Sequence, residues 1–212
     1  TYEDGSEEIV GTDTSWQVTE EGPLKEADLY DGEVYDATAE TTGWRNATVE
    51  NLRVSPAIRA AYGPAVTAHE EFSPITCTKV DNCLVYDFGQ NFAGVVRLDI
   101  RGKKGQKIVV RHAEILNPDG SLNTVFLRTA KARIEYTCVD GEQTYSPRFT
   151  YMGFRYVGVE GIDVEDIHVT AAALSAKLKG TDTTLAQKLI TEGAISQAAW
   201  DQAFQTYVQL CG

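Results

Sequence analysis

A succession of short segments with alternating apolar and polar residues constrains this chain more than any other feature. The alternation is plainest at residues 84–88 (Leu-Val-Tyr-Asp-Phe) and 95–100 (Val-Val-Arg-Leu-Asp-Ile). Such alternation is typical of β-strands that bury one face. From about residue 7 to residue 175 no helical pattern separates the strands, so the crossovers of a parallel α/β fold are missing. We therefore predict an all-β fold of antiparallel, jelly-roll-like β-sandwich modules.

Turn chemistry marks where the strands connect. Gly102-Lys-Lys-Gly105 separates the strand at 95–100 from a further one at 107–111. Two strands joined by a short loop that contains glycine indicate a hairpin. Asn117-Pro-Asp-Gly120 and Asp140-Gly141 predict two more turns.

The four cysteines do not show the Cys-x-x-Cys spacing of a zinc site. Cys77 and Cys83 flank a hairpin-like stretch of five residues that can bring them across from each other. A disulfide between them is one expectation, and free buried thiols are the other.

The chain of 212 residues is long enough for one large or two small domains. We predict a partial β-sandwich over residues 1–70, a second β-sandwich over 71–178 and a short C-terminal helical segment over 179–212. In this tail the apolar residues follow helical spacing; they are Trp200, Phe204, Tyr207, Val208 and Cys211. Such a face predicts packing against the sandwich or self-association through the helices.

The net charge of −12 comes from the N-terminal part of the chain, because residues 1–40 hold thirteen acids and one base, Lys25. An acidic chain does not offer the basic surface that nucleic acids require. No run of about 18 apolar residues is present to span a membrane. We predict neither a nucleic acid nor a membrane as partner.

Four of these acids, Asp28, Asp31, Glu33 and Asp36, lie in one polar segment. Carboxylate oxygens are the ligands that Ca²⁺ prefers. We predict these four as candidate calcium ligands, with a solvated acidic face as the alternative. A glycoside hydrolase needs one carboxyl group whose pKa is raised, for example by removal from water. Nothing in the sequence indicates that any of the four is removed from water.

Other catalytic constellations are not evident, and we predict no catalytic residue. His69, His112 and His168 lie in separate segments, and no Ser or Cys has the Gly-x-Ser-x-Gly context of a hydrolase nucleophile. The histidines are therefore interpreted as structural.

Aromatic side chains in turn-rich segments are candidates for sugar binding, because aromatic rings pack against the C–H faces of sugars. Such residues are Trp16, Tyr30, Tyr35, Trp44, Tyr62, Tyr145 and Tyr151, and the candidates are Trp16, Tyr30, Tyr35 and Trp44. The alternative is that most of the aromatic residues belong to the core.

Two series of motifs resemble bacterial α-L-rhamnosidases. The first resembles the N-terminal accessory domain of that family and comprises Thr12–Trp16, Asp28–Ala37 and Gly43-Trp44. The second resembles the β-sandwich that follows it and comprises Tyr86–Gly94, Arg111–Glu114 and Phe149–Val157. The resemblance covers about residues 5–170.

The resemblance implies two β-sandwich modules, the first related to calcium-dependent, rhamnose-binding modules. In the family an (α/α)6 barrel follows with the catalytic carboxylates, and its motif is not found after Thr170. We therefore expect a non-catalytic module that recognises rhamnose-containing polysaccharides or glycosides. It is expected outside the cell or on its surface, with the cytoplasm as the alternative. The competing hypothesis is a glycosidase fragment whose sandwiches only support a barrel.

The motif Tyr86–Gly94 contains three polar residues, Asp87, Gln90 and Asn91. Polar side chains in a turn that contains glycine often bond to backbone groups, so a structural role is expected for all three.

Overall fold

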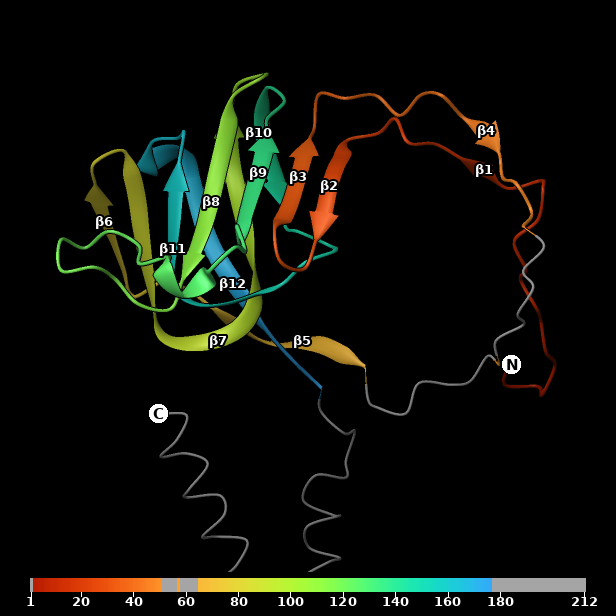
Figure 1. The fold of residues 1–212 in the computed structure, drawn as a ribbon, viewed down its shortest axis with the longest axis horizontal. Helices are drawn as coiled ribbons and strands as arrows, with labels where there is room; N and C mark the ends of the chain where they lie inside the picture. The colour runs from red at the N-terminus through yellow and green to blue at the C-terminus, as the bar shows by residue number, and fades with distance from the viewer. Residues whose placement is uncertain (1, 51–56, 58–64, 177–212) are drawn as a thin grey trace, which may run out of the picture. The chain divides into compact units, whose positions relative to one another are not determined.

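The computed structural model describes residues 2–50, 57 and 65–176, and their regular structure is almost entirely β (Figure 1). The strands are β1 (Gln17–Val18), β2 (Leu24–Asp28), β3 (Gly32–Asp36), β4 (Arg45–Asn46), β5 (Val66–Phe72), β6 (Thr76–Val80), β7 (Cys83–Gly102), β8 (Lys107–Ala113), β9 (Arg133–Thr137), β10 (Gly141–Tyr145), β11 (Met152–Glu160) and β12 (Ile167–Ala176). Two short 3-10 helices are η1 (Val125–Leu127) and η2 (Val164–Asp166).

Residues 1–57 and 68–173 form one compact unit, which holds the features discussed below. A second unit, residues 58–67 and 174–212, contributes only residues 65–67 and 174–176 to the described part of the chain. The predicted C-terminal helical segment, and with it the predicted self-association face, lies outside the described residues. The division into domains at residues 70 and 178 stays a prediction. No helix among the described residues combines the length and the apolar character needed to cross a bilayer.

The sheet curls on itself through the long strand β7, as Figure 1 shows. The first half of β7 pairs with β6 and β11, and its second half pairs with β10 and β12. From β11 the sheet continues through β8, β9 and β3 to β2. The pairs named here are antiparallel except β3 with β9, which is parallel. The predicted all-β fold is thus confirmed, and its shape fits a β-sandwich.

Alternation along β7 explains why both halves contribute to one core. Every second residue is buried in 84–88 and 94–102, Val85 is buried too, and 89–93 are not buried. The residues of both halves that join the same cluster are Leu84, Tyr86, Phe88, Val96, Leu98 and Ile100. Burying a side chain of this size contributes about 1.5–3 kcal/mol. The two segments whose alternation is plainest therefore contribute to one core, together with residues of the other strands.

The predicted hairpin between residues 95–100 and 107–111 is wrong. The end of β7 pairs with β10 and β12, whereas β8 pairs with β9 and β11. The turn after Gly102 is instead a corner that leads from one arm of the curled sheet to the other. It is fastened to the connection between β9 and β10, where Gly105 N donates to Cys138 O at 2.9 Å and Lys104 N donates to the Asp140 carboxylate at 2.7 Å. The turns predicted at 117–120 and at Asp140-Gly141 are both present.

Of the two expectations for Cys77 and Cys83, the structure shows free thiols and no disulfide. The expected hairpin of β6 and β7 is present, with Val80 opposite Cys83 and Cys77 opposite Tyr86. Cys77 lies three positions from Val80, so its side chain and that of Cys83 point to opposite faces of the sheet. Strand register therefore prevents the bond, and Cys77 is exposed rather than buried.

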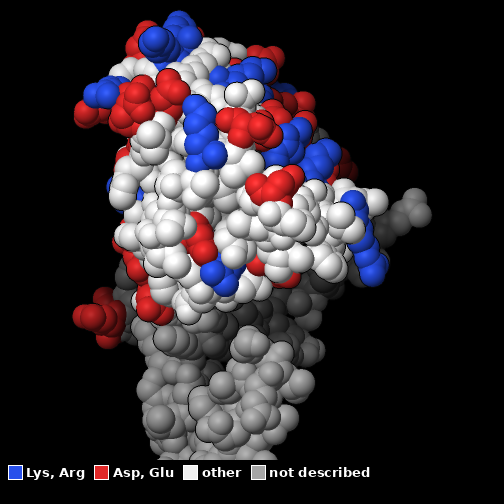
Figure 2. Space-filling view, turned by 90° about the vertical axis from the view of Figure 1, so that its left-hand side faces the viewer, with Lys and Arg blue, Asp and Glu red and all other residues white. Residues whose placement is uncertain are grey.

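Charged side chains of both signs are intermixed on the face shown in Figure 2, over the part that is described. This face therefore presents no extended field of one sign.

Candidate functional site

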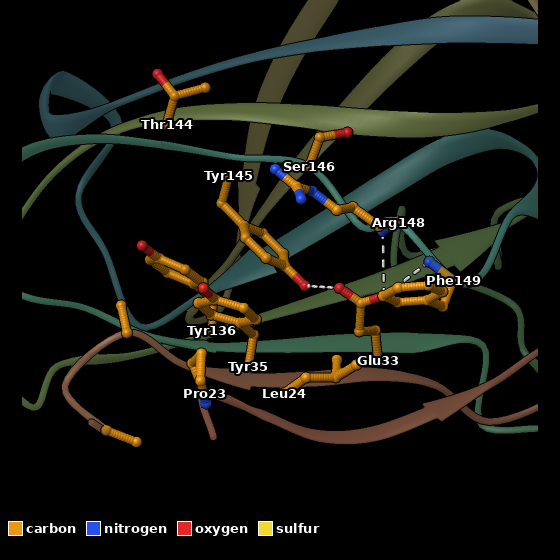
Figure 3. Close-up of a pocket in the computed structure, with 12 residues that line it drawn as sticks. Pro23, Leu24, Glu33, Tyr35, Tyr136, Thr144, Tyr145, Ser146, Arg148 and Phe149 are labelled. Atoms are coloured by element: carbon orange, nitrogen blue, oxygen red, sulfur yellow. Dashed lines mark hydrogen bonds between the residues drawn. The ribbon is translucent and has the colours of Figure 1, made fainter. Parts of the chain in front are cut away.

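A pocket of about 390 Å³ lies beside β3 and β10 and is shown in Figure 3. Most of its walls are aromatic rings and small apolar side chains. The lining residues are Pro23, Leu24, Glu33, Tyr35, Ala37, Ala39, Tyr136, Thr144, Tyr145, Ser146, Arg148 and Phe149. These apolar side chains alternate with polar groups, so the pocket combines apolar faces with hydrogen-bonding groups, as small-molecule sites do.

Three tyrosines form one wall of the pocket. Tyr35 stacks on Tyr136 with ring centroids 5.9 Å apart, and Tyr145 lies 4.5 Å from Tyr136 and 5.3 Å from Tyr35. Burial raises the pKa of Tyr136 to about 12 and that of Tyr145 further, so both rings are neutral in the ordinary pH range. The Tyr136 hydroxyl donates to Gln143 at 3.1 Å. The Tyr35 hydroxyl makes no hydrogen bond to a described residue and is therefore free for a ligand.

Glu33 is the buried acid of the pocket, with 2% of its surface exposed. Its carboxylate accepts hydrogen bonds from the Tyr145 hydroxyl, from Arg148 N at 3.1 Å and from Phe149 N at 3.0 Å (Figure 3). Both oxygens are thus used within the protein. Glu33 therefore fixes the segment after β10 rather than offering a free carboxylate.

The segment that Glu33 holds places two side chains at the rim of the pocket. The Phe149 ring is 61% exposed although it lines the pocket. The Arg148 side chain is also exposed, and no described carboxylate lies within ion-pair distance of its guanidinium. In Figure 3 this side chain extends back from Phe149 toward Ser146 and Tyr145. The rim therefore offers an aromatic face and a guanidinium to a ligand.

Of the four predicted sugar-binding residues, only Tyr35 lines this pocket. Trp16 and Trp44 are 46% and 55% exposed and precede β1 and β4. These strands pair antiparallel, with Gln17 opposite Asn46, so the two tryptophans lie toward opposite ends of the small sheet. Tyr30 is 70% exposed in the turn between β2 and β3. The structure does not bring the four side chains together.

Each of the predicted calcium ligands is engaged in hydrogen bonds within the protein. Asp28 accepts from the backbone N–H groups of Tyr30 and Asp31 and thereby closes the turn between β2 and β3. The Asp31 carboxylate pairs with Lys131 at 2.6 Å, which lowers the pKa of that carboxyl.

Asp36 accepts from the N–H and hydroxyl of Thr38, which lowers the pKa of Asp36. Glu33 is buried in the pocket. In the part of the chain that the structure describes, no three His, Cys, Asp or Glu side chains gather as a metal site would require. The four acids therefore do not fit a calcium ion.

A second surface feature is an apolar patch formed by the turn between β2 and β3, η1 and the start of β11. Its members are the exposed Leu29, Tyr30 and Tyr151 and the half-buried Leu127, together with Val125 and Phe126, which neighbour Leu127 in the chain. Leu29, Tyr30, Leu127 and Tyr151 together line a depression of about 200 Å³. Val125 and Phe126 precede Leu127 in η1 and are 79% and 71% exposed. Clustered exposed apolar side chains of this kind mark interaction surfaces.

Two predicted structural roles are supported by the geometry. His112 is fully buried, its Nδ1 lies 2.9 Å from Ala132 O, and burial lowers its pKa to about 4. Asp87 accepts two hydrogen bonds from Arg155, at 2.8 and 2.9 Å, and one from Gly89 N. The strand pairing explains why the motifs of the second series belong together, because Tyr156 lies opposite both Asp87 and Ala113.

Sequence reasoning missed Tyr136, Arg148 and Phe149 as pocket residues, whereas Tyr145 was among the aromatic residues of turn-rich segments. Tyr136 lies in an alternating strand, where a core position is the ordinary interpretation. The only available signal for Phe149 was that it begins a motif that resembles the family.

Comparison with known proteins assigns the chain to two neighbouring domains. Residues 1–79 match a family described as the alpha-L-rhamnosidase N-terminal domain. Residues 78–178 match the bacterial alpha-L-rhamnosidase concanavalin-like domain.

Individual relatives agree with these matches. An α-L-rhamnosidase of Streptomyces avermitilis is 40% identical over 173 residues, which is 76% of this chain and 17% of the relative. One of Alteromonas sp. is 31% identical over 175 residues, 77% of this chain and 19% of the relative. The crystal structure of the Streptomyces avermitilis enzyme complexed with L-rhamnose aligns with a TM-score of 0.74 at 36% identity, over 83% of this chain and 18% of that one. The chain thus spans about a fifth of the length of these relatives.

Proposed function

The chain carries the N-terminal and concanavalin-like domains of the bacterial α-L-rhamnosidases, and we propose that it is a non-catalytic module that recognises rhamnose-containing glycans. Such a module would act outside the cell or on its surface, where polysaccharides are met. The observation that carries the proposal is the pocket with the tyrosine wall, because it combines aromatic faces with two free hydrogen-bonding groups.

The chemistry of the pocket suits a deoxysugar. L-Rhamnose has a methyl group in place of one hydroxymethyl group, and Leu24, Ala37 and Ala39 supply an apolar surface for it. The Tyr35 hydroxyl and the Arg148 guanidinium can meet the sugar hydroxyls, while Phe149 offers a ring face at the rim. The relative of Streptomyces avermitilis was crystallised with L-rhamnose, which supports this choice of ligand.

The test is the melting temperature with increasing L-rhamnose, in the wild type and in two variants. A ligand at about ten times its Kd stabilises the folded state by about 1.4 kcal/mol, which raises Tm by roughly 3–6 °C in a chain of this size. Phe149→Ala removes a ring of the pocket and should weaken binding about fivefold. Phe126→Ala, an exposed phenylalanine outside the pocket, is the matched control and should bind as the wild type does. If millimolar rhamnose leaves the wild-type Tm unchanged, the proposal fails.

The apolar patch favours a second candidate function, that of supporting a catalytic barrel in a longer α-L-rhamnosidase. Exposure of apolar side chains such as Leu29 and Phe126 to water costs free energy, and another domain that covers them would remove that cost. This function predicts cooperative unfolding, no sugar response, and binding of a hydrophobic dye that the double variant Leu29→Ser, Phe126→Ser abolishes. Weak dye binding that the double variant leaves unchanged would speak against it.

A further inference from the structure

The two charged side chains of the pocket differ in how accessible they are to a ligand. Among the described residues that line it, Glu33 and Arg148 alone carry a formal charge. Glu33 is buried and its two oxygens accept three hydrogen bonds from the protein. Arg148 is exposed and pairs with no described carboxylate. The negative charge is therefore held inside, and the positive charge is presented at the rim.

We infer that Arg148 makes the pocket selective for acidic glycans, in which the sugar next to the rhamnose unit carries a carboxylate or a sulfate. This inference rests on the proposed function, because it assigns the unit that neighbours the bound rhamnose. A guanidinium presents two parallel N–H donors whose spacing matches the two oxygens of such a group. A neutral sugar can use the same donors, but it gains nothing from the charge.

The backbone of Arg148 is held in place by hydrogen bonds, and a fixed position of the guanidinium favours selective binding of an anion. Its N–H donates to Glu33 at 3.1 Å, and the N–H of the neighbouring Phe149 donates to the same oxygen at 3.0 Å. The side chain thus starts from a fixed point, so less conformational freedom is lost when it binds an anion. Because Glu33 is already bonded to this segment, Arg148 does not need to fold inward to neutralise it.

The experiment is calorimetric titration of the 212-residue chain with three probes at low salt. They are a disaccharide of a uronic acid linked to L-rhamnose, the same disaccharide with its carboxyl group reduced to an alcohol, and the reduced disaccharide with a sulfate on the sugar that neighbours L-rhamnose. We expect the wild type to bind the acidic disaccharide about tenfold more tightly than its reduced counterpart, since a charge-assisted hydrogen bond contributes about 1.5 kcal/mol or more. Arg148→Gln should remove this preference, so that it binds the two disaccharides equally and no more tightly than the wild type binds the reduced one. Arg148→Lys should keep part of the preference, because a lysine retains the charge without the fork.

Arg128→Gln is the matched control, because Arg128 is exposed, unpaired with any described carboxylate and absent from the pocket lining. The preference should survive in this variant and should weaken with added salt. Whether the uronate or the sulfate binds more tightly identifies the source of the anion. Equal affinity of the wild type for the acidic and reduced disaccharides, or a preference that persists in Arg148→Gln, overturns the inference while the proposed function stands. Failure of every probe to bind the wild type overturns both.

Discussion

Removing the Glu33 carboxylate is the most informative perturbation of the candidate site. In Glu33→Ala the Tyr145 hydroxyl and the N–H groups of Arg148 and Phe149 lose their acceptor. A buried donor without a partner costs about 1–3 kcal/mol, and water entering through the pocket limits the cost to the lower end, so the expected loss is about 3–4 kcal/mol. Glu33→Gln keeps one oxygen for the two N–H groups and can donate to the Tyr145 hydroxyl. It should cost about 1–2 kcal/mol, the part that came from the charge.

The assay is urea unfolding followed by tryptophan fluorescence, with Glu26→Ala as the matched control. Glu26 is exposed on the same hairpin and makes no ion pair with a described residue. Its replacement should therefore change the free energy of unfolding by no more than about 0.5 kcal/mol. Hydrogen exchange at the Arg148 and Phe149 amides should speed up in Glu33→Ala but not in Glu26→Ala. If Glu33→Ala were no less stable than the control, the idea that this carboxylate anchors the rim of the pocket would be wrong.

Two further predictions concern pH and calcium. Burial lowers the pKa of His112 to about 4, against about 6.5 for an unfolded histidine. Between these two values the unfolded chain binds a proton on His112 and the folded chain does not. Stability is therefore complete above about pH 6.5 and falls by about 2 kcal/mol between pH 7 and pH 5, and urea titrations should show that His112→Gln lacks this part of the pH dependence. Millimolar calcium added to metal-stripped protein should leave Tm unchanged to within about 1 °C, because no three acids gather into a metal site among the described residues. A rise with calcium that magnesium does not reproduce would contradict the structural interpretation of these acids.

Alternation along the chain was sufficient to predict which residues of β7 are buried but not what its strand partners are. A period of two fixes the face on which Leu84 or Val96 lies, and the structure buries both. Pairing depends on where the chain goes next, and a turn such as 102–105 serves equally as a hairpin or as a corner between arms of the sheet. The same limit explains the cysteine result, since a shift of one residue in register moves Cys77 to the other face.

The candidate site was less predictable because its interactions join distant parts of the chain. Glu33 and Tyr145 are 112 residues apart, and nothing near Glu33 in the sequence distinguishes it from Asp31 or Asp36. All three stand in an acidic segment, yet Asp31 pairs with an exposed lysine while Glu33 is enclosed. What separates them is the parallel pairing of β3 with β9, which directs Glu33 toward the core side of the sheet. A pairing between strands a hundred residues apart leaves no local trace.

The two candidate functions use different surfaces but share one structural element. Residues 146–151 contribute Arg148 and Phe149 to the pocket and Tyr151 to the apolar patch. The buried carboxylate of Glu33 fastens this segment from the pocket side through two backbone N–H groups. Variants of Glu33 should therefore disturb both surfaces, whereas Phe149→Ala affects only the pocket and Phe126→Ala only the patch. The two surface variants can thus separate sugar recognition from domain support, and no substitution at the anchor can.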